Sequence, residues 1–261
     1  MIDVIVTSTC RKQFEATYAS FVKNVKYRGG FRFIIHVDVF EKNKRYLPKL
    51  LEFLRHNGID DVKINMGKHS FANAVNYLHG RLESEYYFNL EDDWIFLRRI
   101  DLDSIIQVMK NNENIHNIRF SKERIKKPGL IAKKRLAKSN ELYLLTGDQV
   151  SLGGTDLIES TLWSLNPHIA RTLIAKQFPH IPEGTNPENF LFKKYNSKFT
   201  VSGLYIYGKY GDPPYVKDIG RHCFLVKKIK TISEILRNPS LIKKQDRMKK
   251  MERYLGGQFE S

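Results

Sequence analysis

The feature that most constrains the fold is an apolar run that ends in three consecutive acids. Residues 85–90 are rich in aromatic side chains, Glu91, Asp92 and Asp93 follow directly, and apolar residues return at Trp94. Ionised carboxylates are costly near a dry core and repel one another unless positive charge compensates them. Divalent cations such as Mg²⁺ take oxygen ligands and commonly share them with phosphate oxygens. We therefore predict a metal–diphosphate site at the end of a buried strand, with a solvated acidic turn as the alternative.

The first half of the chain alternates strand signals with helix signals. Short runs of β-branched or aromatic residues are separated by segments in which apolar residues recur at helical spacing. This alternation predicts βαβ units that form an α/β fold, with a mainly parallel sheet and helices on both faces. Ligands of such sheets bind beyond the carboxyl ends of the strands, where the three acids lie. The expected strands are 2–8, 31–39, 62–66, 85–90 and 115–120, and the expected helices are 12–26, 47–54, 71–78 and 101–111.

The second half of the chain is less regular. A helix is predicted to start at Asn186, because Pro187 suits the first helical position. The other expected elements are a basic excursion over 121–141, one or two short strands within 142–154, a helix over 168–178, a strand over 201–207, a Gly/Pro-rich loop over 208–214 and a basic amphipathic helix over 231–255.

Length and composition exclude several classes of protein. With 261 residues, of which 41% are hydrophobic, the chain fits one large domain or two small ones with a sizeable core. No apolar run approaches the roughly 20 residues that span a bilayer, and the N-terminus lacks the basic start of a signal peptide. The two cysteines, Cys10 and Cys223, argue against a disulfide scaffold and a structural zinc site. They suit a reducing cytoplasm, where we expect the protein to act.

The formal net charge of +16 is concentrated in two segments. Residues 119–138 hold nine Lys or Arg and one acid, and residues 217–261 hold twelve Lys or Arg and five acids. Such a field favours a polyanionic partner, which can be nucleic acid, an anionic membrane or an acidic polymer. A solubilising basic surface is the alternative, although an excess of that kind would spread along the chain.

Four segments together carry a resemblance to a known family. The most specific is the acidic strand end, Leu90-Glu91-Asp92-Asp93-Trp94, and the others are 6–11, 71–76, and 165–167 taken with 218–221. In this order they resemble the GT-A fold of nucleotide-sugar glycosyltransferases, most of all small bacterial and phage members related to glycosyltransferase family 2. The resemblance implies a single catalytic domain over 1–222, divided into a nucleotide-sugar half (1–118) and an acceptor half (119–222), and a basic helical tail over 223–261.

The resemblance also implies roles for polar residues in these segments. Asp93 would bind a divalent cation, Mn²⁺ or Mg²⁺, that bridges the diphosphate of a nucleotide sugar and neutralises the charge of the leaving group. Glu91 stands two residues earlier, on the same side of the strand, and it or Asp92 would hold ribose or sugar hydroxyls. The expected nucleotide-binding residues are Thr7, Thr9, Arg11, Asp38 and Asn73, of which Asp38 would accept hydrogen bonds from the base or ribose.

An acceptor-side base and a further metal ligand complete the expected site. Inverting transferases remove a proton from the acceptor hydroxyl, and the candidate base is Glu188 at the expected helix start, ahead of Asp148 and Asp156. An N-terminal helix acid favoured by the macrodipole is the alternative for Glu188. Related sequences often carry His where Asp218 stands, and His222 follows nearby, so both are candidate metal ligands. For His222 a structural or surface role is the alternative.

These observations predict a metal-dependent glycosyltransferase that moves a sugar from a nucleotide sugar of the UDP-glucose type to an acceptor hydroxyl. The charge distribution favours DNA with a hydroxymethylated or glycosylated base as acceptor, as in phage DNA-modifying enzymes, which would act in the host-cell cytoplasm. The candidates for stacking on an extruded base are Tyr205, Tyr207, Tyr210 and Tyr215. One alternative is a polysaccharide or lipopolysaccharide transferase, docked peripherally on an anionic membrane through 231–255. Another is a non-catalytic nucleic-acid-binding protein, although such a protein has no need of three acids at a strand end.

Overall fold

The computed structural model describes residues 1–125, 146–160, 163–198 and 203–220. The chain divides into two compact units, Met1–Asp218 and Ile219–Ser261. The expected C-terminal tail and its helix, together with most of the basic excursion, lie outside the described residues. The predicted domain boundary after residue 222 therefore stays a prediction.

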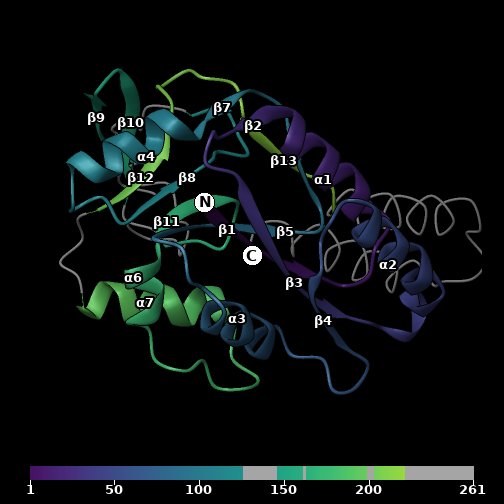
Figure 1. Cartoon of the computed structure of the whole chain (residues 1–261). Coiled ribbons are helices and arrows are strands. Elements are labelled where there is room, and N and C mark those ends of the chain that lie inside the picture. Colours follow the sequence, from purple (N-terminus) through teal and green to yellow (C-terminus); the bar gives the residue numbers. More distant parts are fainter. Residues whose placement is uncertain (126–145, 161–162, 199–202, 221–261) are drawn as a thin grey trace, which may run out of the picture. The chain divides into compact units, whose positions relative to one another are not determined.

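A nine-stranded sheet lies at the centre of the first unit (Figure 1). Its strands are β1 (Ile2–Ser8), β3 (Phe31–Asp38), β4 (Asp61–Asn65), β5 (Tyr86–Glu91), β8 (Asn117–Arg119), β9 (Thr146–Leu152), β10 (Thr155–Ser160), β11 (His168–Arg171) and β12 (Leu204–Tyr207), in the spatial order β4-β3-β1-β5-β11-β8-β12-β10-β9. The first four strands in this order are parallel to one another, as the strand–helix alternation predicts. Beyond β5 the sheet is mixed, because β11 runs antiparallel to both of its neighbours and β10 runs antiparallel to β12 and β9.

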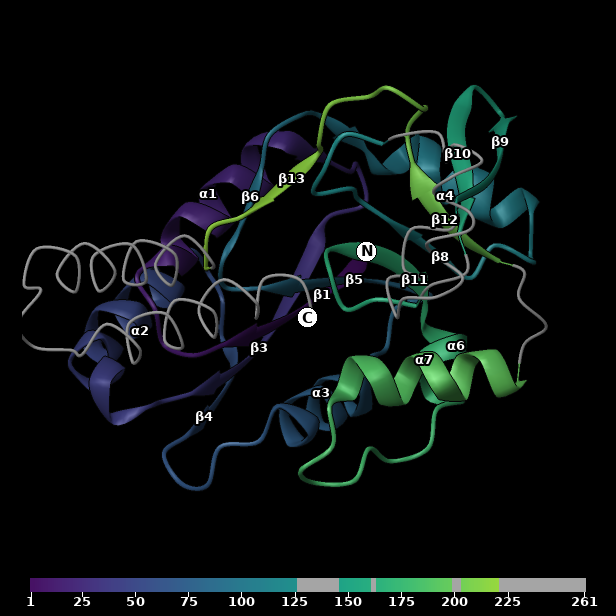
Figure 2. The same cartoon turned by 180° about the vertical axis from the view of Figure 1, so that it is seen from behind.

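Helices cover both faces of the sheet, as predicted. They are α1 (Gln13–Asn24), α2 (Leu47–His56), α3 (Phe71–Gly80), α4 (Leu102–Asn111), α6 (Thr172–Lys176) and α7 (Pro187–Lys198). Figures 1 and 2 show α3, α6 and α7 on one side of the sheet and α1, α2 and α4 on the other. Each set packs its apolar side chains into a separate core cluster against alternate residues of the strands, such as Phe88 on one face and Tyr87 on the other. Within the described residues, no helix has both the length and the apolar character that crossing a bilayer requires.

Helix ends follow the local sequence closely in the first half. The hydroxyl of Ser70 accepts a hydrogen bond from the backbone N–H of Asn73 (3.3 Å) and so caps the N-terminus of α3. In the same way Asp101 caps α4 by accepting from the backbone of Ser104. The helix predicted over 12–26 ends earlier, because Val25–Lys26 form a short strand, β2, that pairs with β7 (Ile100–Asp101).

The helix predicted over 168–178 is wrong in its first part. Residues 168–171 form β11, and only the short helix α6 follows. The spacing of Ile169, Leu173 and Ile174 suits a helix. His168, Ile169 and Ala170 are nevertheless buried in the middle of the sheet. Pairing with β5 on one side and β8 on the other satisfies the backbone of this segment and overrides its local helical pattern.

A second small sheet brings the end of the first unit next to the acidic strand. β13 (Val216–Asp218) runs antiparallel to β6 (Trp94–Phe96), with Asp218 opposite Trp94. Trp94 is buried in the core cluster that also holds α1. Because Trp94 directly follows Asp93, this pairing places Asp218 close to Asp93, which lies in the turn between β5 and β6.

Candidate functional site

The three acids stand at the carboxyl ends of the parallel strands, as predicted. Thr7 of β1 pairs in register with Glu91 of β5, so the two strands end side by side. The backbone N–H of Asp92 then donates to the carbonyl of Thr7 (3.1 Å) before the chain turns into β6. The sheet edge therefore presents the loop after β1 and the acidic turn after β5 together.

Asp92 is built into the scaffold of this edge. Its side chain is 1% exposed and accepts hydrogen bonds from the Ser8 hydroxyl (2.9 Å), the Thr9 backbone N–H (2.7 Å) and Arg11 Nη2 (2.5 Å). The Ser8 hydroxyl also accepts from the backbone of Cys10, which lies in the left-handed region at φ 58°. Since protein donors occupy both oxygens of Asp92, it shapes the loop after β1, and Glu91 is the better candidate for holding a ribose or sugar hydroxyl.

Arg11 supplies positive charge to two of the acids at once. Its Nη2 atom lies 2.5 Å from Asp92 Oδ1 and 3.0 Å from Asp93 Oδ2. A metal ion was the compensating charge predicted from the sequence, so the role of this arginine is an addition that only the structure reveals. Arg11 was predicted in the nucleotide pocket, and it does lie at the same sheet edge as the acids.

The acidic cluster formed by Glu91, Asp92, Asp93 and Asp218 nevertheless keeps an excess of negative charge. Burial raises the pKa of Asp93 to about 6, and the carboxylates of Asp92 and Asp218 contribute in the same direction against the opposing effect of Arg11. Burial, followed by the charges of Asp93, Asp92 and Glu188, raises the pKa of Glu91 to about 8. At neutral pH the cluster therefore retains a proton that a bound cation can displace.

Glu188 reaches this cluster from a distant part of the chain. It stands in the first turn of α7, and its Oε1 atom accepts hydrogen bonds from the Ser164 hydroxyl (2.6 Å) and the Leu165 backbone N–H (3.2 Å). The N-cap of α7 is Asn186, whose side chain accepts from the backbone of Asn189 (3.1 Å). The carboxylate of Glu188 thus contacts Ser164 and Leu165, in a segment near Glu91. An acid that only stabilised the start of its own helix would not need these contacts.

The predicted nucleotide residues occupy two neighbouring strand ends. Asp38 ends β3, is nearly buried and accepts a hydrogen bond from the Asn65 side chain (2.6 Å). The ring of His69 lies beside it and packs against Phe40 in a tilted arrangement, with ring centroids 4.1 Å apart. Thr7 lies near the end of β1, the neighbouring strand, and Thr9 directly follows that strand, so three of the five predicted residues share this edge with Arg11.

Other predicted positions lie apart from the cluster or outside the described residues. The Asn73 side chain is exposed at the start of α3, and no described contact joins it to the acids. Asp148 and Asp156 lie on β9 and β10, which β11, β8 and β12 separate from β5, so neither is placed to act with Asp93. His222 lies beyond the described part of the chain.

Two of the four candidate stacking tyrosines belong to the core instead. Tyr215 is 6% exposed and packs against Tyr207 with ring centroids 4.9 Å apart. The guanidinium of Arg98 lies over the Tyr215 ring. Tyr207 packs in turn against Phe120. Alternation of aromatic and basic residues in this segment therefore reflects packing between β12 and the loop that follows it.

Sequence reasoning missed three residues around Glu188. Arg119 is buried in β8 and donates to the Ser160 hydroxyl (3.2 Å), and burial lowers its pKa to about 10 against the opposing charge of Glu188. A cation inside an apolar strand was a signal available in the sequence. Ser164 and Asn89 carried no comparable signal, since isolated Ser and Asn residues are common everywhere.

The cluster suits a metal ion that is shared with a substrate. Among the described residues, no three His, Cys, Asp or Glu side chains are grouped closely enough to bind an ion by themselves. Mg²⁺ commonly takes one or two carboxylates and completes its shell with phosphate oxygens and water. The carboxylates of Asp93 and Asp218 repel each other, which a cation between protein and substrate would relieve, and they would supply oxygen ligands of this kind. The residues present therefore fit a metal held jointly with a diphosphate.

Comparison with known proteins adds information about the fold. No protein-family model matches the chain, and no curated protein matches its sequence. Residues 1–349 of TarS from S. aureus match with a TM-score of 0.54 and 14% identity over 86% of this chain, and the same part of TarS in complex with UDP-GlcNAc matches with a TM-score of 0.52 and 14% identity over 82%.

A longer TarS structure matches with a TM-score of 0.51 and 12% identity over 98% of this chain. The chain spans 62%, 58% and 43% of these three TarS structures, less than two thirds of each. The mixed α/β fold, with its large sheet covered on both faces, is therefore of the GT-A type, as the resemblance predicts.

Proposed function

We propose that the protein is a metal-dependent glycosyltransferase that moves a sugar from a nucleotide sugar to an acceptor hydroxyl. The observation that carries this proposal is the convergence of Glu91, Asp93, Asp218 and Glu188 at the carboxyl edge of a GT-A-type sheet. These acids come from β5, the turn after it, β13 and α7. TarS, which has a similar fold, has been solved with UDP-GlcNAc and with UDP, so UDP-sugars are the donors to test first.

On the donor side, Asp93 and Asp218 would hold Mn²⁺ or Mg²⁺ together with the diphosphate. When bound, the cation stabilises the negative charge of the departing nucleoside diphosphate. Asp38 accepts a hydrogen bond from the base or ribose. Glu91 accepts a hydrogen bond from a sugar hydroxyl. Roles for Asn73 and His222 rest on the resemblance alone.

On the acceptor side, Glu188 acts as the general base. It takes the proton of the acceptor hydroxyl while that oxygen bonds to the anomeric carbon and the bond from this carbon to the diphosphate breaks. The hydrogen bonds from Ser164 and Leu165 fix the position of its carboxylate.

The proposed acceptor is DNA that carries a hydroxymethylated or glycosylated base. The support is the net charge of +16 and its concentration in the segments 119–138 and 217–261, since contacts to phosphates supply most of the affinity of proteins that bind DNA without sequence preference. Binding of this acceptor also requires the tail and the basic excursion to contact DNA phosphates. Both segments contain the Lys and Arg residues that such contacts need.

The test is transfer of radiolabelled sugar from UDP-glucose and UDP-GlcNAc, with Mn²⁺, to a duplex containing hydroxymethylcytosine. Unmodified duplex and a bacterial polysaccharide serve as competing acceptors. Label in the modified duplex supports the whole proposal, whereas label in the polysaccharide alone would move the acceptor to the membrane-associated alternative. If the protein neither transfers nor hydrolyses any sugar donor, the transferase proposal is wrong.

Asp93→Asn provides the matching variant, and we expect it to lower kcat by at least about 10²-fold. Asp103→Asn is its control, because this aspartate lies on α4 and forms a surface ion pair with Arg28 (3.4 Å). Equal activity of the two variants would argue against a metal site at Asp93.

A further inference from the structure

A short irregular segment, residues 164–166, lies between the sheet and Glu188. Ser164 and Leu165 are almost fully buried. The Ser164 hydroxyl and the Leu165 backbone N–H both donate to the same atom, Oε1 of Glu188 (2.6 and 3.2 Å). Among the described residues, no donor contacts the other oxygen, Oε2. Two donors on one oxygen hold the carboxylate in a single orientation and leave Oε2 to accept a proton.

The sheet itself holds this segment in place. Asn89 Nδ2 donates to the Leu165 carbonyl (2.5 Å), and His168 Nδ1–H donates to the Asn166 carbonyl (2.8 Å). Asn89 and His168 pair in register across β5 and β11, so their side chains lie in one row on the same face. The backbone N–H of Asn166 donates to the Ser164 hydroxyl (3.2 Å), and this hydrogen bond fixes the position of the hydroxyl relative to the backbone of its own segment.

The row of side chains that includes Asn89 and His168 also fixes residues 164–166 relative to the acidic strand end. Glu91 stands two residues beyond Asn89 on the same strand and therefore projects to the same side. Arg119 pairs with His168 on β8, continues the row, and acts on Glu188 through its charge. The separation between Glu188 and the acidic strand is thus set by contacts that run from Asn89 through Leu165 to Glu188.

We propose that Ser164 is a positioning residue for Glu188, and that Asn89 holds Ser164 in place through Leu165. This inference rests on the proposed function, in which Glu188 takes the proton of the acceptor hydroxyl. A glutamate has a long side chain, and a base that is misplaced by about 1 Å can lose on the order of 10²-fold in rate. The hydroxyl of Ser164 supplies the shorter of the two hydrogen bonds that prevent this displacement.

The test compares Ser164→Ala, Ser164→Thr and the wild type. UDP release from UDP-glucose and UDP-GlcNAc is followed with Mn²⁺, with water or the hydroxymethylcytosine duplex as acceptor. We expect Ser164→Ala to lower kcat by about 10- to 100-fold while KM for the nucleotide sugar changes less than about twofold, since the donor-side acids are untouched. Ser164→Thr retains a hydroxyl and is expected to restore most of kcat.

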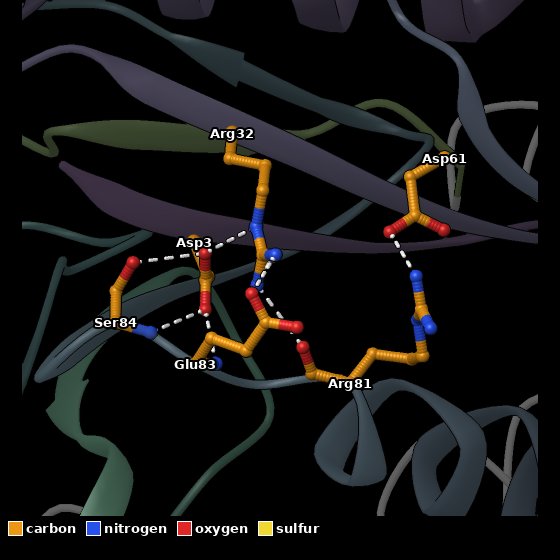
Figure 3. Close-up of polar contacts among 6 residues, drawn as sticks. All are labelled: Asp3, Arg32, Asp61, Arg81, Glu83 and Ser84. Carbon is orange, nitrogen blue, oxygen red and sulfur yellow. Dashed lines mark hydrogen bonds and ion pairs between the residues drawn. The ribbon is translucent and has the colours of Figure 1, made fainter.

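Ser84→Ala is the matched control. The Ser84 hydroxyl donates to the buried carboxylate of Asp3 (2.9 Å), at the opposite end of β1 (Figure 3). This variant loses the same kind of hydrogen bond, so thermal unfolding of both variants reports the structural cost. Only Ser164→Ala is expected to change kcat.

A double-mutant cycle with Glu188→Gln separates positioning from a general loss of structure. If Ser164 acts through Glu188, Ser164→Ala changes kcat little once Glu188 is replaced. An equal loss in both backgrounds, or a wild-type kcat in Ser164→Ala, would overturn this inference alone. A wild-type protein that turns over no nucleotide sugar would overturn the proposed function, and this inference with it.

Discussion

The guanidinium of Arg11 contacts Asp92 and Asp93 together, through one nitrogen that lies 2.5 Å from the first carboxylate and 3.0 Å from the second. The loop after β1 and the turn after β5 are joined by this contact. Any ligand that binds Asp93 must therefore do so beside a positive charge that the chain itself supplies, which suits an anionic ligand such as a diphosphate.

Replacing Arg11 with Ala is expected to destabilise the protein by about 2 kcal/mol, because Asp92 is left buried with less compensation. The Arg11 side chain remains 30% exposed, so solvent screening keeps the cost below that of a fully buried pair. Urea denaturation at pH 7 measures the change. Arg28→Ala, which removes an arginine with a 90% exposed side chain, is the control and is expected to change the midpoint little. Equal midpoints for the two variants would contradict the assigned role of Arg11.

Metal binding is expected to strengthen as pH rises from about 6 to about 8. The pKa values of Asp93 and Glu91 are raised to about 6 and about 8, so a cation must displace protons from the cluster at lower pH. For the same reason these two groups favour the folded metal-free protein below about pH 4 and destabilise it as pH rises through the folded pKa values.

Calorimetric titration with Mn²⁺ at pH 6 and pH 8 measures this dependence. Asp218→Asn is expected to weaken Mn²⁺ binding at pH 8 by at least about tenfold. An affinity that is independent of pH, or one that Asp218→Asn leaves unchanged, would contradict the proposal that Asp93 and Asp218 hold the metal.

The opposite end of β1 depends on a second buried carboxylate (Figure 3). Asp3 accepts hydrogen bonds from Arg32 Nε (2.8 Å), the backbone N–H groups of Glu83 (2.7 Å) and Ser84 (2.8 Å), and the Ser84 hydroxyl. Burial opposes them, but these donors hold the pKa of Asp3 below its ordinary value. Its contribution to stability is therefore present above about pH 4 and is lost as pH falls through the folded pKa.

Asp3→Asn is expected to cost about 3 kcal/mol, because an amide leaves some of these buried donors unsatisfied. Asp61→Asn, which affects the more exposed pair with Arg81 in the same view, is the control and is expected to have a small effect. Urea midpoints at pH 7 compare the two variants, and similar losses would show that Asp3 is no more important than a surface ion pair.

Acid is expected to destabilise the protein through His168. This side chain is fully buried, and burial lowers its pKa to about 3, although the hydrogen bond to Asn166 opposes the shift. The unfolded chain takes up a proton near pH 6.5 whereas the folded protein does not, so stability falls as pH decreases below about 6.5. At pH 5 the loss from this group is about 2 kcal/mol.

The measurement is the free energy of unfolding of the wild type and of His168→Gln between pH 7 and pH 5. The variant is expected to be less stable at pH 7 but to lose less on acidification. Parallel pH profiles for the two proteins would show that His168 does not contribute to the acid sensitivity.

The sequence by itself determined the elements whose signals are local. The strands 2–8 and 31–39, the cap at Ser70 and the buried strand that ends in three acids were all predictable, because periodicity and capping depend on residues a few positions apart. The resemblance then pointed to Glu188 and Asp218 one residue at a time. Neither argument indicated which contacts hold these residues.

Only the tertiary structure decided how these residues meet. The strand order places β11 beside β5, which turns an expected helix into a strand and brings Ser164 and Leu165 onto Glu188. The pairing of β13 with β6 sets Asp218 beside Asp93, and the loop after β1 brings Arg11 onto both aspartates at the turn. Such contacts join residues far apart in the chain, so they are fixed by the packing of the whole sheet and leave no periodic signal in the sequence.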